Sequence, residues 1–375
     1  MPFFDTTDNQ LLPFSRPPCE VCPLGLGGTC RGPNTRLSLY DPQLHGITCS
    51  DQGKIAELVL NLKRNLPRGE PVISQPHPSK LPSFVPILDR DLPPDIGLDK
   101  RLLVGVSIGS LMNPDGRLRY SSGIELRRGI GLPEGCRLCL FLTCDEQLLE
   151  ALWRSSLETK CWQTFRSYEL EFCTGTSFSV WSLHGTRAEQ RINIERNFAS
   201  MSFLASVGVP AVPFIFCVMD EDFFSAGQWL RRNPEVKIVG QYARFYKTLE
   251  KFRLLLDKME RLQSAAGREL RFLVQGCAKR EKLEALFARF PDAIVATSKP
   301  FSAARSGRLL HKEDLTELAI SKEQLEWKRL CPLNVQAFHQ ATKALTGGHL
   351  VDSPPYGITH PQEGTSAQTH LELTI

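Results

Sequence analysis

Hydrophobic residues between positions 168 and 219 change from one spacing to another and back. The run YELEFCTGTSFSVW has the apolar content of a strand and continues into glycine and polar residues. Residues 187–207 then place apolar side chains at the spacing of one helix face, and Gly208 follows, as glycine commonly follows a helix. Residues 211–219 are apolar throughout, as in a strand covered on both faces. The segment therefore predicts a strand, a helix and a second strand.

The same alternation extends from residue 102 to residue 296. Strand-like runs occur at 102–108, 137–142, 168–172, 212–218, 236–240, 270–274 and 293–296. Helix patterns lie between most of them, for example at 246–265 and 279–290. Alternating strands and helices predict a parallel sheet with helical crossovers. With an eighth strand at 123–126 or after residue 301, we expect an α/β fold with a closed or nearly closed (β/α) barrel. An open doubly wound sheet is the alternative, although no GxGxxG or GxxxxGK[ST] loop follows any strand.

The flanking segments have a different character from this barrel domain, which we place at 101–346 with helices at 312–328 and 334–345 near its end. Residues 1–50 are rich in proline, glycine and cysteine and show no sustained period. Residues 51–100 predict a helix at 51–65 and then a proline-rich, irregular connector along the surface of the barrel. Residues 347–375 are polar and aperiodic, so we expect a disordered tail.

Composition adds only weak constraints on function. The 375 residues are 42% hydrophobic and carry a net charge of +4, which permits a polyanionic partner without demanding one. No stretch approaches 18 uninterrupted apolar residues, and the amino terminus lacks the basic start and apolar core of a signal peptide. We therefore expect a cytoplasmic protein without a membrane partner. The pattern makes no prediction of oligomeric state.

Cysteines in the amino-terminal segment predict a metal site. Cys19 and Cys22 form a CxxC pair, Cys30 follows a glycine-rich loop, and Cys49, further on, or an acidic side chain is the fourth ligand. No histidine completes the set, which favours an iron–sulfur cluster over zinc. The alternative is that these are incidental cysteines in a proline-rich loop.

A second group of candidate residues lies at the predicted strand ends, which in a parallel sheet share one edge. Cysteines stand there together with Asp145, Ser177, Gln275 and Lys299, which supply acid, nucleophile, amide and amine groups. We predict that one catalytic cavity is lined by Asp145, Cys173, Ser177, Cys217 and Cys277. The competing interpretation is that the cysteines, with Cys144, pack in the core, since cysteine is among the most buried residue types.

Basic residues alternate with aromatic ones in three places. These are 231–232, the segment QYARFYK at 241–247, and 299–308. Such mixtures suit phosphate contact combined with base stacking, so they favour a nucleic-acid or nucleotide partner. The alternative is an ordinary charged surface.

Several short segments lie between residues 136 and 300: FLTCD, LEALW, TSFSVW, the helix from residue 187 to 197, and GVPAVP. Together they resemble a family of bacterial and phage proteins whose shared domain has no assigned function. The family has an aspartate before an E-x-x-W helix, a PDFS-like strand end and a G-[IV]-x-x-[IV]-P strand start; Thr176 and Ser177 stand where it has proline and aspartate. The resemblance implies a barrel-like α/β fold and an association with mobile elements. The CxxCPLG segment is also similar, over a few residues, to the first cysteine pair of iron–sulfur uracil-DNA glycosylases.

Two hypotheses of function follow. The first is a metal- or iron–sulfur-containing barrel enzyme that acts on a nucleotide or nucleic-acid component in phage or mobile-element biology. The second is a non-catalytic scaffold that binds nucleic acid or protein and has a structural metal loop. A polar pocket at the strand ends would favour the enzyme, and an apolar, filled mouth beside a basic surface would favour the scaffold.

Overall fold

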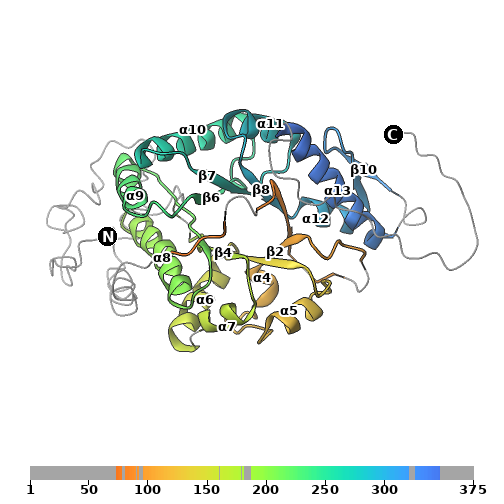
Figure 1. Ribbon diagram of the computed structural model, residues 1–375, viewed down its shortest axis with the longest axis horizontal. Helices are drawn as coiled ribbons and strands as arrows, with labels where there is room; N and C mark the ends of the chain where they lie inside the picture. The colour runs from red at the N-terminus through yellow and green to blue at the C-terminus, as the bar shows by residue number, and fades with distance from the viewer. Residues whose placement is uncertain are drawn as a thin grey trace, which may run out of the picture.

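Eight parallel strands form one curved sheet in the structure, a computed structural model that describes residues 73–77, 81–89, 91–92, 96–159, 161–178, 180, 187–320 and 326–346. The strands are β1 (Phe84–Leu88), β2 (Leu103–Ser107), β3 (Arg137–Phe141), β4 (Phe172–Thr174), β5 (Ala211–Val212), β6 (Ile238–Tyr242), β7 (Arg271–Gln275) and β8 (Ile294–Thr297). Their hydrogen-bonded order is β5-β4-β3-β2-β1-β8-β7-β6. A bridge between Phe214 and Gly240, in which Gly240 N donates to Pro213 O at 2.7 Å, links β5 to β6. The prediction of a barrel-like parallel α/β fold is confirmed (Figure 1).

Side chains alternate between the inside and the outside of the barrel, as in any strand. One buried cluster fills the interior and includes Val85, Leu103, Phe141 and Leu273. A larger cluster contains the alternate positions of the same strands, such as Val104, and the apolar faces of the helices. Both sides of the strands are therefore apolar, which explains their continuous hydrophobic runs.

Helices connect and cover the strands on the outside (Figure 1). After β2, β3 and β4 come α4 (Ile108–Leu111), α5 (Gly123–Gly129), α6 (Glu146–Thr159), α7 (Trp162–Ser167) and α8 (Arg187–Ser206). After β5, β6 and β7 come α9 (Asp220–Arg232), α10 (Leu249–Ala266) and α11 (Arg280–Arg289). Following β8 are α12 (Lys299–Arg305), the antiparallel hairpin β9 (Arg308–Leu310) and β10 (Glu317–Ala319), and α13 (Trp327–Leu345). None of these described helices is long and apolar enough to cross a membrane.

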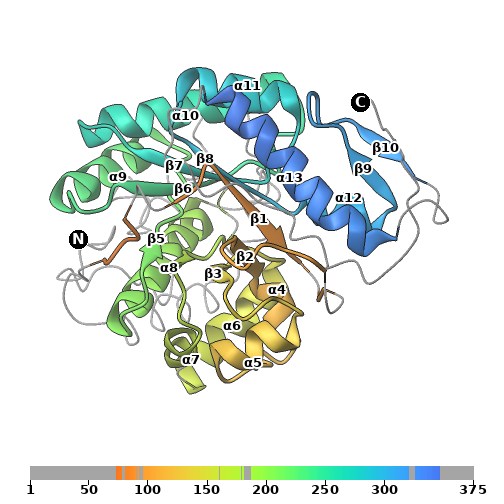
Figure 2. The same ribbon diagram turned by 45° about the vertical axis from the view of Figure 1, so that its right-hand side comes forward.

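The eighth strand is not where the sequence analysis placed it. It is β1, inside the proline-rich segment predicted to be an irregular surface connector, and all five of its residues are buried. Residues 123–126 lie in α5 instead, and the strands that follow residue 301, β9 and β10, pair with each other outside the eight-stranded sheet. In the described residues no helix separates β1 from β2; α13 packs against β1 through Phe338, whose ring centroid is 4.6 Å from that of Phe84 (Figure 2).

Two other element predictions differ from the structure. The helix predicted at 312–328 is wrong, because that segment contains strand β10 and only the first residues of α13. The strand predicted at 168–172 starts later, at Phe172, because Tyr168 ends the turn after α7 and donates its buried hydroxyl to Tyr120 O at 2.6 Å. The amino-terminal segment, the helix predicted at 51–65 and the carboxyl-terminal tail lie outside the described residues.

Candidate ligand-binding site at the barrel mouth

The carboxyl ends of the eight strands form the mouth of the barrel, and an apolar cluster lies on the side of β4 and β5. Phe214 and Phe216, which follow β5, form a buried cluster with Val180 and with Ile194 of α8. Tyr242, the last residue of β6, packs against the same cluster. Val180, Phe214 and Phe216 therefore place apolar side chains on this side of the mouth.

Two polar side chains meet in the interior just below the mouth. Gln275 ends β7 and Thr143 follows β3, and the Gln275 amide Nε2 donates to Thr143 Oγ1 at 2.5 Å. The other amide atom, Oε1, is buried and has no hydrogen-bond partner among the described residues. A buried polar atom without a partner costs about 1–3 kcal/mol, so this amide is one that a bound ligand or water would satisfy.

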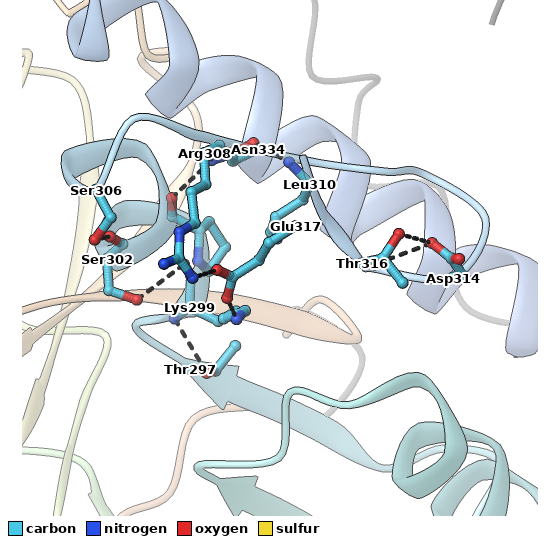
Figure 3. A network of polar contacts seen from close by, with 11 residues as sticks. Thr297, Lys299, Ser302, Ser306, Arg308, Leu310, Asp314, Thr316, Glu317 and Asn334 are labelled. Atoms are coloured by element: carbon cyan, nitrogen blue, oxygen red, sulfur yellow. Dashed lines mark hydrogen bonds and ion pairs between the residues drawn. The ribbon is translucent and has the colours of Figure 1, made fainter. Parts of the chain in front are cut away.

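A cluster of charged side chains lies at the end of β8. Lys299 begins α12 two residues after β8 ends, and its backbone N donates to Thr297 Oγ1 at 3.2 Å. Both Lys299 Nζ and the guanidinium of Arg308 contact the carboxylate of Glu317, which β10 carries to this point (Figure 3). One carboxylate therefore holds two cations, one from each side of the turn between α12 and β9.

The buried side chain of Asn334 fixes the position of this cluster. Its Oδ1 accepts from Leu310 N at 2.7 Å, and its Nδ2 donates to Arg308 O at 2.9 Å and to Pro300 O at 3.2 Å. These bonds join α12, β9 and α13 through one amide (Figure 3). Asn334 thus bonds the backbone of Arg308 itself and of Pro300, which follows Lys299. The backbone that carries both charged side chains is therefore fixed.

Positive charge exceeds negative charge around Lys299. Partial burial and the neighbouring cations Arg308 and Lys279 lower the pKa of the Lys299 ammonium below its ordinary value. Contact with Glu317 acts in the opposite direction and favours the charged form. An additional anion bound here would stabilise the ammonium and raise its pKa again. The site is therefore electrostatically suited to an anionic ligand.

The catalytic residues predicted from the sequence occupy different environments. Cys173 alternates with the interior residue Phe172 and lies in the outer hydrophobic layer, as does Cys277. Burial raises the pKa of the Cys277 thiol to about 12 and that of Cys173 well above its ordinary value. Asp145 is exposed, and its Oδ1 accepts from Leu148 N at 3.0 Å at the start of α6.

Of the remaining candidates, two are half-buried near the mouth and four lie outside the described residues. Ser177, in the loop after β4, and Cys217, after β5, are half-buried, and Cys217 packs against the outer hydrophobic layer. A catalytic role for any of the five predicted residues stays a prediction. Cys19, Cys22, Cys30 and Cys49 lie outside the described residues. Within the described part of the chain, no group of three or more His, Cys, Asp or Glu side chains could hold a metal ion.

We expect Cys173 and Cys277 to resist alkylation in the native protein, because the thiolate is the reactive form and burial disfavours it. Treatment with iodoacetamide, followed by peptide mapping, should show both residues modified only after denaturation. The half-buried Cys217 should react earlier. Rapid native labelling of Cys173 or Cys277 would show that the outer layer opens and would return them to the list of candidate nucleophiles.

Sequence reasoning identified Lys299, Gln275 and the basic segment 299–308 but missed their partners. Glu317 was missed because its segment was interpreted as a helix. A signal was present: the apolar residues of RLL and ELA flank a turn of charged residues, which is typical of a hairpin. Thr143 has no such signal, since its partner Gln275 is 132 residues away.

No family model matches the chain, and no curated protein sequence matches it significantly.

Proposed function

We propose that the protein is a (β/α) barrel enzyme that binds a phosphate-bearing ligand, a nucleotide or a nucleic-acid component, at the ends of β7 and β8. The observation that carries this proposal is that Lys299 and Arg308 both form ion pairs with the Glu317 carboxylate. A carboxylate held by an ammonium and a guanidinium occupies the kind of site that a phosphate group prefers. Lys279, close enough to influence Lys299, adds a third cation.

The position in the fold supports the same class of ligand by analogy. In many (β/α) barrel enzymes, the loops after the seventh and eighth strands bind phosphate groups. Fold analogy alone does not establish a function, so the charges on this chain carry the argument. The orphaned Gln275 amide lies next to β8, where Gln275 pairs with Ala296, and offers a polar group to the part of the ligand that enters the mouth.

The second candidate function is a non-catalytic scaffold that binds nucleic acid or protein. The apolar cluster beside β4 and β5 favours it, because its four buried side chains are valine, isoleucine and phenylalanine and carry no acid, base or nucleophile. A measurement of product formation distinguishes the enzyme from the non-catalytic scaffold. Incubation with nucleoside triphosphates and with single-stranded oligonucleotides, analysed by mass spectrometry, would yield products that depend on Lys299 if the protein is an enzyme.

A metal centre in the amino-terminal segment remains part of this proposal. Cys19, Cys22, Cys30 and Cys49 are the residues that would hold an iron–sulfur cluster or zinc. A phage or mobile-element context and a cytoplasmic location agree with a nucleotide or nucleic-acid ligand. Metal analysis and an absorption spectrum of protein purified without oxygen test the centre.

Replacing Lys299 or Arg308 with glutamine should weaken the binding of pyrophosphate. A hydrogen bond between charged groups contributes about 1.5–3 kcal/mol, which corresponds to roughly 10- to 150-fold in dissociation constant. Isothermal titration calorimetry measures the change. Because both side chains are partly exposed, the variants should remain folded.

Arg253→Gln is the matched control, because Arg253 is an exposed arginine on α10 and its replacement removes the same charge. It should bind pyrophosphate as the unmodified protein does. Equal affinities for all three variants would mean that the charges at the end of β8 do not hold the ligand, and the proposal would be withdrawn.

A further inference from the structure

The loop after β6 is held in place by its neighbours. Lys282 of α11 donates from Nζ to Tyr246 O at 2.6 Å and to Lys247 O at 2.9 Å. At the start of the loop, Ala243 N donates to Gln275 O at 2.7 Å. Lys282 is buried and satisfies two backbone carbonyls, so it acts as a tether for the loop.

This tethered loop presents an aromatic ring to solvent. The Phe245 side chain is 54% exposed, although large apolar side chains gain free energy from burial. Its ring meets that of Tyr242 edge to face, with centroids 5.4 Å apart and an interplanar angle of 70°. Arg244 and Lys247 beside it are exposed. An exposed ring on a fixed backbone, flanked by cations, is the arrangement on which unpaired bases stack.

The loop is continuous with the cation cluster at the end of β8. Gly276, after β7, has a φ of +87°, and a Cβ there would lie 3.2 Å from Arg244 N, so the loops after β6 and β7 touch. Lys279 follows three residues later at the start of α11, and its positive charge lowers the pKa of Lys299. Lys299 and Arg308 share Glu317. Among the described residues, the other carboxylate paired with these cations is Glu281, whose Oε1 lies 3.9 Å from Lys279 Nζ.

We propose that this rim, from Phe245 across the ends of β6, β7 and β8 to Arg308, binds single-stranded nucleic acid, with one base stacked on Phe245. The inference rests on the proposed function, since Lys299 and Arg308 would hold one of the phosphates. The cations extend over three neighbouring strands spaced about 4.8 Å apart, a span that suits more than one phosphate. A duplex does not fit, because its bases are stacked on one another and cannot reach the ring.

The test is fluorescence anisotropy with a dye-labelled oligothymidylate of about ten nucleotides, within the range that single-strand sites cover. Phe245→Ala should weaken binding by roughly 5- to 150-fold, the loss that follows from about 1–3 kcal/mol per stacked base. Phe245→Trp should bind at least as well as the unmodified protein. Thermal unfolding should change little in either variant, because more than half of the Phe245 side chain is exposed.

Ile124→Ala serves as the control for loss of an exposed apolar side chain, because Ile124 is 62% exposed on α5, on the other side of the barrel (Figure 2). Its affinity should match that of the unmodified protein. Salt titration adds a second readout, since Arg308→Gln should reduce the dependence of affinity on salt and Phe245→Ala should not.

The oligonucleotide and pyrophosphate measurements test single-strand binding and the phosphate site separately. If Phe245→Ala and the unmodified protein bind the oligonucleotide equally, or if duplex binds as well as single strand, the inference is overturned. Loss of pyrophosphate binding in Lys299→Gln would still support the proposed function. Binding of pyrophosphate without any binding of oligonucleotide would limit the ligand to a small molecule.

Discussion

Replacing Gly227 with alanine should lower the free energy of unfolding by about 2–3 kcal/mol, near the upper end for an added methyl group in a packed core. Gly227 lies on the buried face of α9, where that helix meets the last turn of α10. A Cβ at this position would lie 2.4 Å from the Ala265 carbonyl oxygen and 2.6 Å from its carbonyl carbon. A backbone group cannot rotate away as a side chain can, so the two helices would have to separate.

The direction of this effect is informative, because alanine ordinarily stabilises a helix interior by about 1 kcal/mol relative to glycine. Gly109→Ala is the matched control: Gly109 is exposed in α4, and the nearest atoms to its added Cβ are 3.6 Å away. That variant should be as stable as the unmodified protein or slightly more stable. Urea denaturation compares the two. A stabilising effect of Gly227→Ala would show that α9 and α10 are not in close contact.

The fold could be predicted wherever the spacing of hydrophobic residues in the sequence matches the side chains that are buried in the structure. Seven strands were found because they are apolar runs and helix patterns lie between most of them. β1 was missed because proline marks turns and edges, and Pro86 lies in the middle of this strand. Pro86 lacks a backbone N–H, yet β1 is central in the sheet and pairs with β2 and β8. All five residues of this apolar run are buried, but Pro86 and the neighbouring prolines outweighed that signal in the sequence analysis.

The candidate site could be predicted only in part, for a similar reason. Gln275 stands directly after an apolar run and Lys299 a few residues after the next one, so their place at the strand ends follows from the sequence. Their environment depends on Glu317 and Thr143, which come from distant segments. The cysteines at the strand ends were predicted to line a catalytic cavity, but the alternation of side chains within β4 directs Cys173 away from the barrel interior. A shift of one residue in the start of that strand changes which side chains enter the barrel.

The polar residues of α8 show a second limit of pattern reasoning. The sequence pattern places Glu195 and Arg196 largely off the apolar face, yet both are buried, with Arg196 only 2% exposed. The Arg196 guanidinium donates through Nη1 and Nη2 to the two carboxylate oxygens of Glu150, at 2.7 Å each. Its central carbon lies 3.5 Å from the centroid of the Phe178 ring. Pairing with α6 and stacking on the loop after β4 together allow this charge to be buried.

Removal of Glu150 should therefore destabilise the protein more than removal of Arg196. Glu150→Leu leaves a buried cation without a counter-charge, a change that costs about 3–5 kcal/mol. Arg196→Met should cost less, because the Glu150 side chain is 38% exposed and its carboxylate can be hydrated. Urea denaturation of the two variants measures the difference.

The double variant Glu150→Leu with Arg196→Met distinguishes an unpaired charge from simple loss of packing. Both charges are then replaced by apolar groups, so it should be more stable than Glu150→Leu alone, although it carries one more substitution. An exposed pair sets the baseline: the Arg289 guanidinium lies 2.5 Å from Asp257, yet Arg289→Gln should change stability by less than about 1 kcal/mol. If Glu150→Leu costs no more than this surface variant, the Arg196 cation finds water when its partner is gone. The loop after β4 would then have to open readily, and Phe178 would no longer cover the guanidinium.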